Sequence, residues 1–241
     1  MKKFVIGDIH GGLRALQQIL SKAPISGDST LIFLGDYVDG WSESPQVLDF
    51  LIELRLNYPC IFMRGNHDDL LLNYLKTGEY KEEWFMHGGR STIEAYQNIS
   101  TSQKEEHIRF IENLRDYYLD SENRLFVHAG FTNVRGIEAE YFKPMLYWDR
   151  SLWETALALN PNLNSDSDFY PQRLKLYKEI FIGHTPVTRI HKEVPVNASC
   201  IWNVDTGAAF KGKLTIMDVE TKEFWQSDSL PELYPDENGR N

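Results

Sequence analysis

Short apolar runs alternate with amphipathic stretches through the first third of the chain. The runs at 4–6, 31–34 and 61–63 have the length and composition of buried strands. The stretches at 13–20, 47–54 and about 69–75 carry apolar residues at helical spacing. Because strands that alternate with helices are joined by crossover connections, this order predicts an α/β fold with a largely parallel sheet.

The alternation stops between about residues 78 and 115. Three short helical stretches at 80–85, 92–96 and 104–114 are interrupted by Gly88-Gly89, which predicts a helical insertion. Strands resume at 125–127 and 180–182, and the closely spaced runs at 200–204, 214–219 and 223–226 are expected to pair antiparallel. We therefore predict one domain over residues 1–226 and a flexible tail over 227–241.

Polar residues follow five of the predicted strands, each in a turn that contains glycine. The turns are Gly7-Asp8-Ile9-His10-Gly11, Gly35-Asp36-Tyr37-Val38-Asp39-Gly40, Arg64-Gly65-Asn66-His67-Asp68, His128-Ala129-Gly130 and Gly183-His184-Thr185-Pro186. Glycine allows a sharp turn without a Cβ clash. Because the carboxyl ends of parallel strands share one edge of a sheet, we expect six side chains to meet there: Asp8, His10, Asp36, Asn66, His128 and His184.

These side chains offer carboxylate, amide and imidazole ligands and no thiolate, a set that favours Mn²⁺, Fe or Zn²⁺. Six ligands are too many for one tetrahedral catalytic ion that keeps a position open. They suit two divalent ions about 3.5–4 Å apart with one bridging carboxylate. A lone Asp-x-His is usually a turn residue beside a surface or core histidine, but five strand-end motifs together disfavour that alternative. The sequence therefore predicts a dinuclear site, with Mn²⁺ as the preferred ion.

Composition narrows the possible partners. The chain of 241 residues has a net charge of −10, which disfavours binding to nucleic-acid polymers, although bound cations can reverse the field inside a site. The apolar run behind Lys2-Lys3 is shorter than the roughly 7–15 residues of a signal peptide. No stretch approaches the roughly 20 apolar residues of a membrane span. We expect a cytoplasmic protein without a membrane partner, and the oligomeric state stays open.

The five motifs resemble those of the calcineurin-like metallophosphoesterases, from about residue 3 to residue 220. Within that superfamily they are most similar to the phosphoprotein phosphatase branch, which includes bacterial and bacteriophage Ser/Thr phosphatases and symmetrical diadenosine tetraphosphatases. The resemblance implies an αββα sandwich, in which two mixed β-sheets lie between layers of helices. It also implies a phosphoesterase that uses a metal-activated water.

The resemblance further implies a role for each motif residue. Asp8 and His10 would bind the first metal ion, Asp36 would bridge the two ions, and the second ion would be held by Asn66, His128 and His184. His67 would be the general acid for the leaving group, because an imidazole with a pKa near about 6.5 can supply a proton at neutral pH. Asp39 would orient His67.

One position departs from the family pattern. Protein phosphatases of this family usually carry an arginine directly after the second Asp of the second motif, whereas this chain has Gly40-Trp41. Arg150 resembles a second phosphate-binding arginine of the family, the alternative being an ion pair with Asp149 or Glu154. His87 or Arg90 could replace the missing arginine, the alternative being a solvated turn.

The sequence leaves three functions open, two of them enzymatic and one without catalysis. The preferred one is hydrolysis of phosphomonoesters, either phosphoserine and phosphothreonine in proteins or small phosphoesters. The alternative is hydrolysis of dinucleoside polyphosphates of the diadenosine tetraphosphate type. Four aromatic residues favour core packing over base stacking but keep a nucleotide substrate open: Trp84, Tyr147, Trp148 and Trp153. A phosphate-binding protein without catalysis is disfavoured because every ligand and His67 are present. His107 and His191 match no motif and are expected on the surface.

Overall fold

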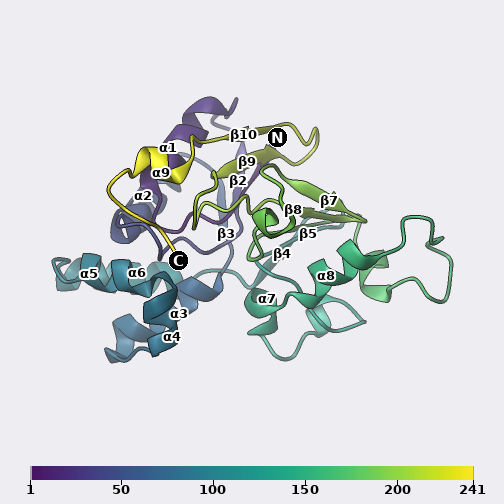
Figure 1. The fold of residues 1–241 in the computed structure, drawn as a ribbon, viewed down its shortest axis with the longest axis horizontal. Helices are drawn as coiled ribbons and strands as arrows, with labels where there is room; N and C mark the ends of the chain where they lie inside the picture. The colour runs from purple at the N-terminus through teal and green to yellow at the C-terminus, as the bar shows by residue number, and fades with distance from the viewer. Residues whose placement is uncertain (1, 241) are drawn as a thin grey trace.

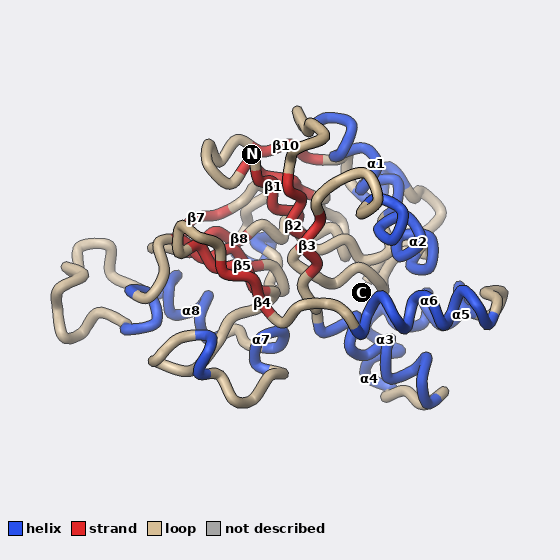
Figure 2. The backbone as a smooth tube through the Cα atoms, turned by 180° about the vertical axis from the view of Figure 1, so that it is seen from behind, coloured by secondary structure: helices blue, strands red, loops and turns tan. Residues whose placement is uncertain are grey.

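The computed structural model describes residues 2–240, which form two five-stranded sheets packed face to face between helices (Figures 1 and 2). The first sheet has the order β10-β9-β1-β2-β3, and its strands in this order are Phe224–Gln226, Thr215–Asp218, Lys3–Ile6, Thr30–Phe33 and Cys60–Phe62. Strands β1, β2 and β3 are parallel, while β9 and β10 run antiparallel at one edge. The crossover units predicted for the first third of the chain are therefore present.

The second sheet has the order β4-β5-β6-β8-β7, with strands Tyr117–Leu119, Arg124–Val127, Glu179–Ile182, Ile201–Asn203 and Val196–Ala198. Its central strands β5, β6 and β8 are parallel, and the edge strands β4 and β7 are antiparallel. The expectation that 200–204 pairs antiparallel with the later runs is wrong in part, because β8 joins β6 in this sheet while β9 and β10 join the other. Strands β4 and β7 were not predicted.

Strand residues alternate between two apolar layers. Val5 and Ile32 of the first sheet and Phe126 and Phe181 of the second share one buried cluster, and the rings of Phe126 and Phe181 stack with centroids 4.8 Å apart. Their neighbours along the strands face outward into clusters that the flanking helices cover. Burial on both faces explains why these strands are continuously apolar in sequence. The four-layer sandwich implied by the family resemblance is thus confirmed.

The helices lie on the outer faces of the two sheets (Figure 1). Those packed beside the first sheet are α1 (Leu13–Lys22), α2 (Ser44–Leu54), α3 (Asn66–Thr77) and α9 (Leu230–Leu233). Those beside the second sheet are α7 (Met145–Trp148) and α8 (Ser151–Ala158), which the sequence did not predict. Short 3₁₀ turns occupy Ile137–Ala139, Gln172–Lys175 and Val187–Ile190. None of the helices within residues 2–240 combines the length and apolar character that a membrane crossing requires.

The segment predicted as an insertion contains α4 (Glu82–Trp84), a π-helical turn (Phe85–Gly89), α5 (Arg90–Tyr96) and α6 (Thr101–Glu112). His107 of α6 is fully buried, and its two ring nitrogens lie 2.7 Å from the Tyr96 hydroxyl and 2.9 Å from Oδ1 of Asp49. The surface position expected for His107 is therefore wrong, because these two partners satisfy the ring inside the helical packing. His191 is exposed as expected.

Residues 227–240 pack against the first sheet and its helices, which differs from the flexible tail expected for 227–241. Leu230 and Tyr234 are buried, and the Tyr234 ring stacks on Trp41 with centroids 5.2 Å apart. Farther along, the Ser42 hydroxyl donates a hydrogen bond of 2.7 Å to Glu237. The segment is polar overall, so its composition predicts a flexible tail even though Leu230 and Tyr234, four residues apart, are buried. Residue 241 lies outside the described part of the chain.

The two sheets are also joined by the buried carboxylate of Asp120. It accepts hydrogen bonds from Nζ of Lys3 in β1 (2.7 Å) and from Nε of Arg124 in β5 (2.9 Å). Burial alone would raise the pKa of Asp120, but the hydrogen bonds from Lys3 and Arg124 lower it to about 2 from an ordinary value of 3.8. The ionised carboxylate therefore stabilises the fold at neutral pH.

Asp120→Asn is expected to lower the free energy of unfolding by about 1–3 kcal/mol at neutral pH, because charge-assisted hydrogen bonds are lost. Since the pKa of Asp120 is depressed, its contribution is present above pH 3.8 and is lost as the pH falls toward about 2. Urea unfolding across this range should show the difference between wild type and variant shrinking with acidity. A difference that is independent of pH would contradict this assignment.

Candidate active site

The site lies where strands of both sheets end. Asp8 follows β1 and Asp36 follows β2, while Asn66 opens α3 directly after β3. From the second sheet, His128 follows β5 and His184 follows β6. The sequence led us to expect one sheet edge, but the site is shared by the strand ends of both sheets. All six residues expected to meet do lie together.

Asp36 is at the centre of this group. Its Oδ2 lies 3.5 Å from Nε2 of His10 on one side and 3.4 Å from Nε2 of His128 on the other. Oδ1 of Asn66 lies 3.2 Å from Nε2 of His128 and 2.9 Å from Nδ1 of His184. Asp36 thus belongs to two clusters of groups that can hold a cation, one with His10 and His67 and the other with His128 and His184. A carboxylate shared by two clusters is the arrangement that a bridging ligand requires.

Backbone carbonyls orient two of the imidazoles. Nδ1 of His10 lies 3.1 Å from the carbonyl oxygen of Val38, and Nδ1 of His128 lies 2.9 Å from that of Leu34. When Nδ1–H donates to a carbonyl, the lone pair remains on Nε2, which in both rings faces Asp36. The turns between strands and helices therefore determine which nitrogen can bind a metal ion.

The backbone is strained at the same residues. His10, Asp36, Asp39 and His184 all have positive φ, between 52° and 73°, a region that residues other than glycine rarely adopt. Close approach also demands glycine nearby, since a Cβ on Gly183 would lie 2.0 Å from Oδ1 of Asp8. Strain concentrated on residues of one site is typical of functional positions.

The six side chains fit divalent cations. Oδ1 of Asp8 and Nε2 of His184 are buried and have no hydrogen-bond partner among residues 2–240. Burial, together with the nearby carboxylates of Asp205 and Asp36, raises the pKa of Asp8 well above its ordinary value. Burial lowers the pKa of His184, which keeps the imidazole neutral and able to bind metal. A cation would both neutralise the carboxylates and occupy the two unpartnered atoms.

His67 and Asp39 form a buried pair beside the cluster. Nδ1 of His67 lies 2.5 Å from Oδ2 of Asp39, and Nε1 of Trp84 donates to the same oxygen at 2.5 Å. The sequence suggested the pair through the family resemblance and favoured a core position for Trp84. Trp84 is buried as expected, and its indole N–H also holds Asp39 in place.

Sequence reasoning missed two buried carboxylates. Asp68 accepts hydrogen bonds from the backbone N–H groups of Gly65, Asp36 and Tyr37, and so ties two motif turns together. Asp205 follows β8 and is close enough to Asp8 to affect its pKa. Burial raises the pKa of Asp68 to about 7 and that of Asp205 to about 6. Asp205 does follow an apolar run and precede a glycine, the same signal as the other motifs.

A cavity of about 490 Å³ opens beside the cluster and is lined by Asp36, Asn66, His67 and His184. Arg150 and His87, both expected to bind substrate, line it. Arg90 does not, because it points along α5 and donates to Glu94 at 2.8 Å. Trp148 also lines the cavity and is 45% exposed, which corrects its expected place in the core.

The ion pairs considered as the alternative role of Arg150 are not formed. The Asp149 carboxylate accepts instead from the backbone N–H groups of Ser151 and Leu152, at the start of α8. Within residues 2–240, no carboxylate lies within 4.0 Å of the Arg150 guanidinium. Arg150 is therefore available to an anion in the cavity.

Comparison with known proteins agrees with this geometry. The calcineurin-like phosphoesterase family model matches residues 1–208. Among curated proteins, the chain is 30% identical to a bis(5'-nucleosyl)-tetraphosphatase PrpE [asymmetrical] of Bacillus cereus (strain Q1), over 89% of each chain. It is 28% identical to the protein of that description from Bacillus mycoides (strain KBAB4), again over 89% of each.

Solved structures show the same fold at lower sequence identity. A candidate diadenosine tetraphosphatase superposes with a TM-score of 0.63 at 18% identity, covering 93% of this chain and 92% of that one. A protein serine/threonine phosphatase from Saccharomyces cerevisiae gives 0.58 at 16% identity, covering 95% and 80%. With motifs, fold and cation-binding clusters in agreement, the chain belongs to the calcineurin-like phosphoesterase family and is a metal-dependent phosphoester hydrolase.

Proposed function

We propose that this enzyme hydrolyses dinucleoside polyphosphates of the diadenosine tetraphosphate type. The observation that carries the proposal is a half-exposed Trp148 in a cationic cavity next to the metal-binding residues. The names of the curated relatives support the same substrate class. Phosphomonoester hydrolysis, including that of phosphoproteins, is the second candidate and is supported by the fold shared with a serine/threonine phosphatase.

Trp148 has the features of a base-stacking platform. Its ring meets the His184 ring edge-on, with centroids 6.3 Å apart, and much of its surface remains open to the cavity. An indole ring offers a large flat apolar face on which a base can stack, and here that face borders the cavity beside the metal-binding residues. A purine that stacks there would have its phosphates beside His184 and Arg150. A small phosphomonoester would leave the ring unused.

In this proposal Asp8 and His10 would hold one divalent cation, Asn66, His128 and His184 would hold the other, and Asp36 would serve both. Mn²⁺ is the proposed ion, with Fe and Zn²⁺ as the alternatives, because the ligands are oxygen and imidazole without thiolate. The two cations would activate water as the nucleophile and offset the charge of the phosphoryl oxygens. Arg150 would bind a phosphate oxygen through its guanidinium.

His67 supplies the proton to the leaving oxygen. Asp39 holds Nδ1, so Nε2 is the nitrogen that remains available to the substrate. Asp39 also fixes the orientation of the ring, and Trp84 prevents Asp39 from turning away. The intact pair argues against a phosphate-binding protein without catalysis.

The direct test gives Mn²⁺-loaded protein a phosphothreonine peptide and diadenosine tetraphosphate in parallel. We expect nucleotide release from the dinucleotide to exceed phosphate release from the peptide. Separation of the nucleotides also identifies the bond cleaved, since ATP with AMP indicates asymmetrical cleavage and two ADP indicate symmetrical cleavage. His67→Asn, purified in the same way, controls for contaminating phosphatases. Turnover of the peptide alone would overturn the proposal in favour of the second candidate.

A further inference from the structure

The cavity beside the metal-binding residues contains three arginines that have no acidic partner. Arg150, Arg189 and Arg240 all line it, and within residues 2–240 none has a carboxylate within 4.0 Å of its guanidinium. Burial and the charges of Arg189 and Arg240 lower the pKa of Arg150, so the three cations repel one another. In a protein with a net charge of −10, such a cluster indicates a site for a highly charged anion.

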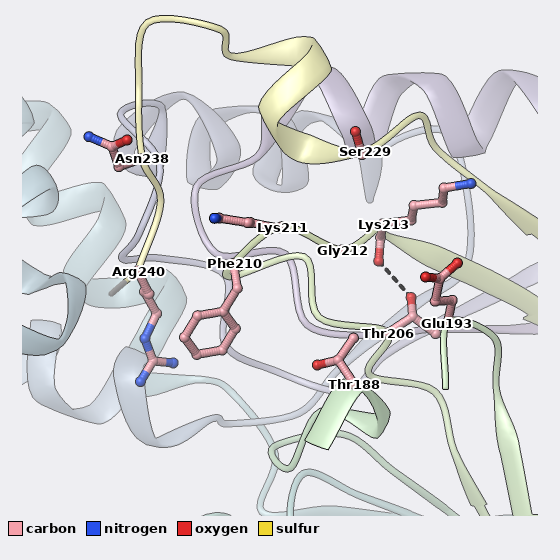
Figure 3. A pocket seen from close by; sticks show the side chains of 10 residues that line it. All are labelled: Thr188, Glu193, Thr206, Phe210, Lys211, Gly212, Lys213, Ser229, Asn238 and Arg240. Carbon is pink, nitrogen blue, oxygen red and sulfur yellow. Dashed lines mark hydrogen bonds between the residues drawn. The ribbon is translucent and has the colours of Figure 1, made fainter. Parts of the chain in front are cut away.

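Arg240 reaches the cavity from a segment that lies outside the family match of residues 1–208. Its backbone N–H donates to the carbonyl of Ala209 at 2.8 Å, which fixes the segment beside the site. Its guanidinium carbon lies 5.3 Å from the centre of the Phe210 ring, and Figure 3 shows the side chain passing alongside that ring. Its Nε is buried and has no hydrogen-bond partner in the described chain. These contacts hold the Arg240 side chain in place, and its Nε–H remains as a donor for a ligand.

The stem of Arg240 occupies the space that a side chain at position 40 would take. A Cβ on Gly40 would lie 3.2 Å from Cγ of Arg240, and one on Gly88 would lie 2.7 Å from the same atom. Gly40 is the position where related protein phosphatases carry an arginine. The backbone N–H of Gly40 donates to the carbonyl of Gly88 at 3.1 Å, so the two glycines lie side by side. Because neither has a side chain, the stem of Arg240 can pass over them into the cavity.

Arg240 also lies between two cavities. A second cavity of about 720 Å³ shares Phe210 and Arg240 with the first and is lined by Lys211 and Lys213 (Figure 3). A substrate long enough to extend from the metal-binding residues into this second cavity must pass the Arg240 guanidinium. A small phosphomonoester such as p-nitrophenyl phosphate is too short to do so.

We propose that Arg240 binds the phosphate chain of the substrate beyond the phosphate under attack, and so selects polyphosphates over monoesters. The proposal rests on the proposed function, because it takes the dinucleoside polyphosphate as the substrate class. Arg150 would serve the phosphate near the metal ions, and Arg240 the phosphates that lead toward Lys211 and Lys213. The charge repulsion among the arginines is relieved when the anion binds.

The test is Arg240→Met, which keeps an unbranched stem against Gly40 and Gly88 but removes the charge. We expect the KM for diadenosine tetraphosphate to rise about 10- to 100-fold, as the loss of hydrogen bonds to a charged group predicts. The kcat/KM for p-nitrophenyl phosphate should change by less than about threefold. Arg135→Met, at an exposed position, is the matched control. Equal losses on both substrates, or no loss on the dinucleotide, would overturn the proposal.

A binding measurement separates this proposal from the proposed function. Calorimetric titration with inorganic tripolyphosphate should show affinity about tenfold weaker or more in Arg240→Met and largely retained in Arg240→Lys. If wild type binds tripolyphosphate through Arg240 but does not cleave the dinucleotide, the role of Arg240 stands and the proposed substrate fails. If wild type cleaves the dinucleotide and both Arg240 variants match it, the role of Arg240 fails alone.

Discussion

His67→Asn is expected to lower turnover about 10²- to 10⁴-fold, the range that a positioned general acid contributes. The loss should be greatest for phosphoserine and phosphothreonine esters, because their alkoxide leaving group departs poorly without a proton, and smaller for the dinucleotide, whose leaving group is a phosphate oxygen. It should also be smaller for p-nitrophenyl phosphate, which has a stable leaving group. The Asp39 carboxylate would remain in place through its bond from Trp84.

Metal content decides whether His67 acts as acid or ligand. The structure groups His67 with His10 and Asp36 in a cluster that can hold a cation, so a ligand role is a real alternative. Its backbone N–H donates to Oδ1 of Asp36 at 2.9 Å and is kept in the asparagine variant. We expect elemental analysis to find unchanged metal in His67→Asn. Loss of an ion would show that His67 is a ligand.

Asp36→Asn is expected to remove at least one of the two metal ions and to lower activity by at least about 10²-fold, the upper range seen when even an outer partner of a ligand is lost. Asp36 is the carboxylate common to both clusters, so a neutral amide weakens both. Burial lowers the pKa of His128, but Asp36 and Asp8 outweigh it and raise the pKa to about 10. Without cations Asp36 thus holds a proton on His128, and a cation bound at Nε2 would take the place of that proton.

Two measurements test this prediction. Elemental analysis after gel filtration gives the metal content, and thermal unfolding with and without added Mn²⁺ gives the stabilisation by metal. Wild type should be stabilised by Mn²⁺, because an ion that binds only the folded state raises the unfolding temperature. Asp36→Asn should show a much smaller shift. Asp168→Asn, in an exposed loop, is the control for a lost carboxylate. Full metal content and a normal shift in Asp36→Asn would contradict the shared-ligand role.

Local pattern predicted much of the site. Each strand-end motif is a short run in which apolar residues form a buried strand, glycine permits the turn and Asp, His or Asn follows. Strand, turn and polar residue all lie within about ten residues of one another, so each motif can be recognised without knowing which distant segments pack against it. Positive φ at His10, Asp36, Asp39 and His184 shows that the turns are as sharp as the glycines beside them suggested.

Pairing between distant segments was less predictable. Strand β8 lies beside β6 rather than beside β9, since apolar runs of similar length fit either sheet. The helix that carries Asn66 and His67 begins at Asn66, several residues before its apolar spacing becomes visible. Trp84 and Trp148 are alike in sequence, yet one is buried against Asp39 and the other is open to the cavity.

The sequence by itself thus determined which side chains meet at the strand ends, because local turns encode them, and its resemblance to the family implied the sandwich fold and the His67–Asp39 pair. Only the tertiary structure decided which basic side chains surround the cavity. Arg90, beside the site in sequence, pairs with Glu94, whereas Arg240 enters the cavity from 200 residues beyond Gly40. The position of a long charged side chain depends on packing between distant segments, here Tyr234 on Trp41 and residue 240 on Ala209, and no local pattern records that packing.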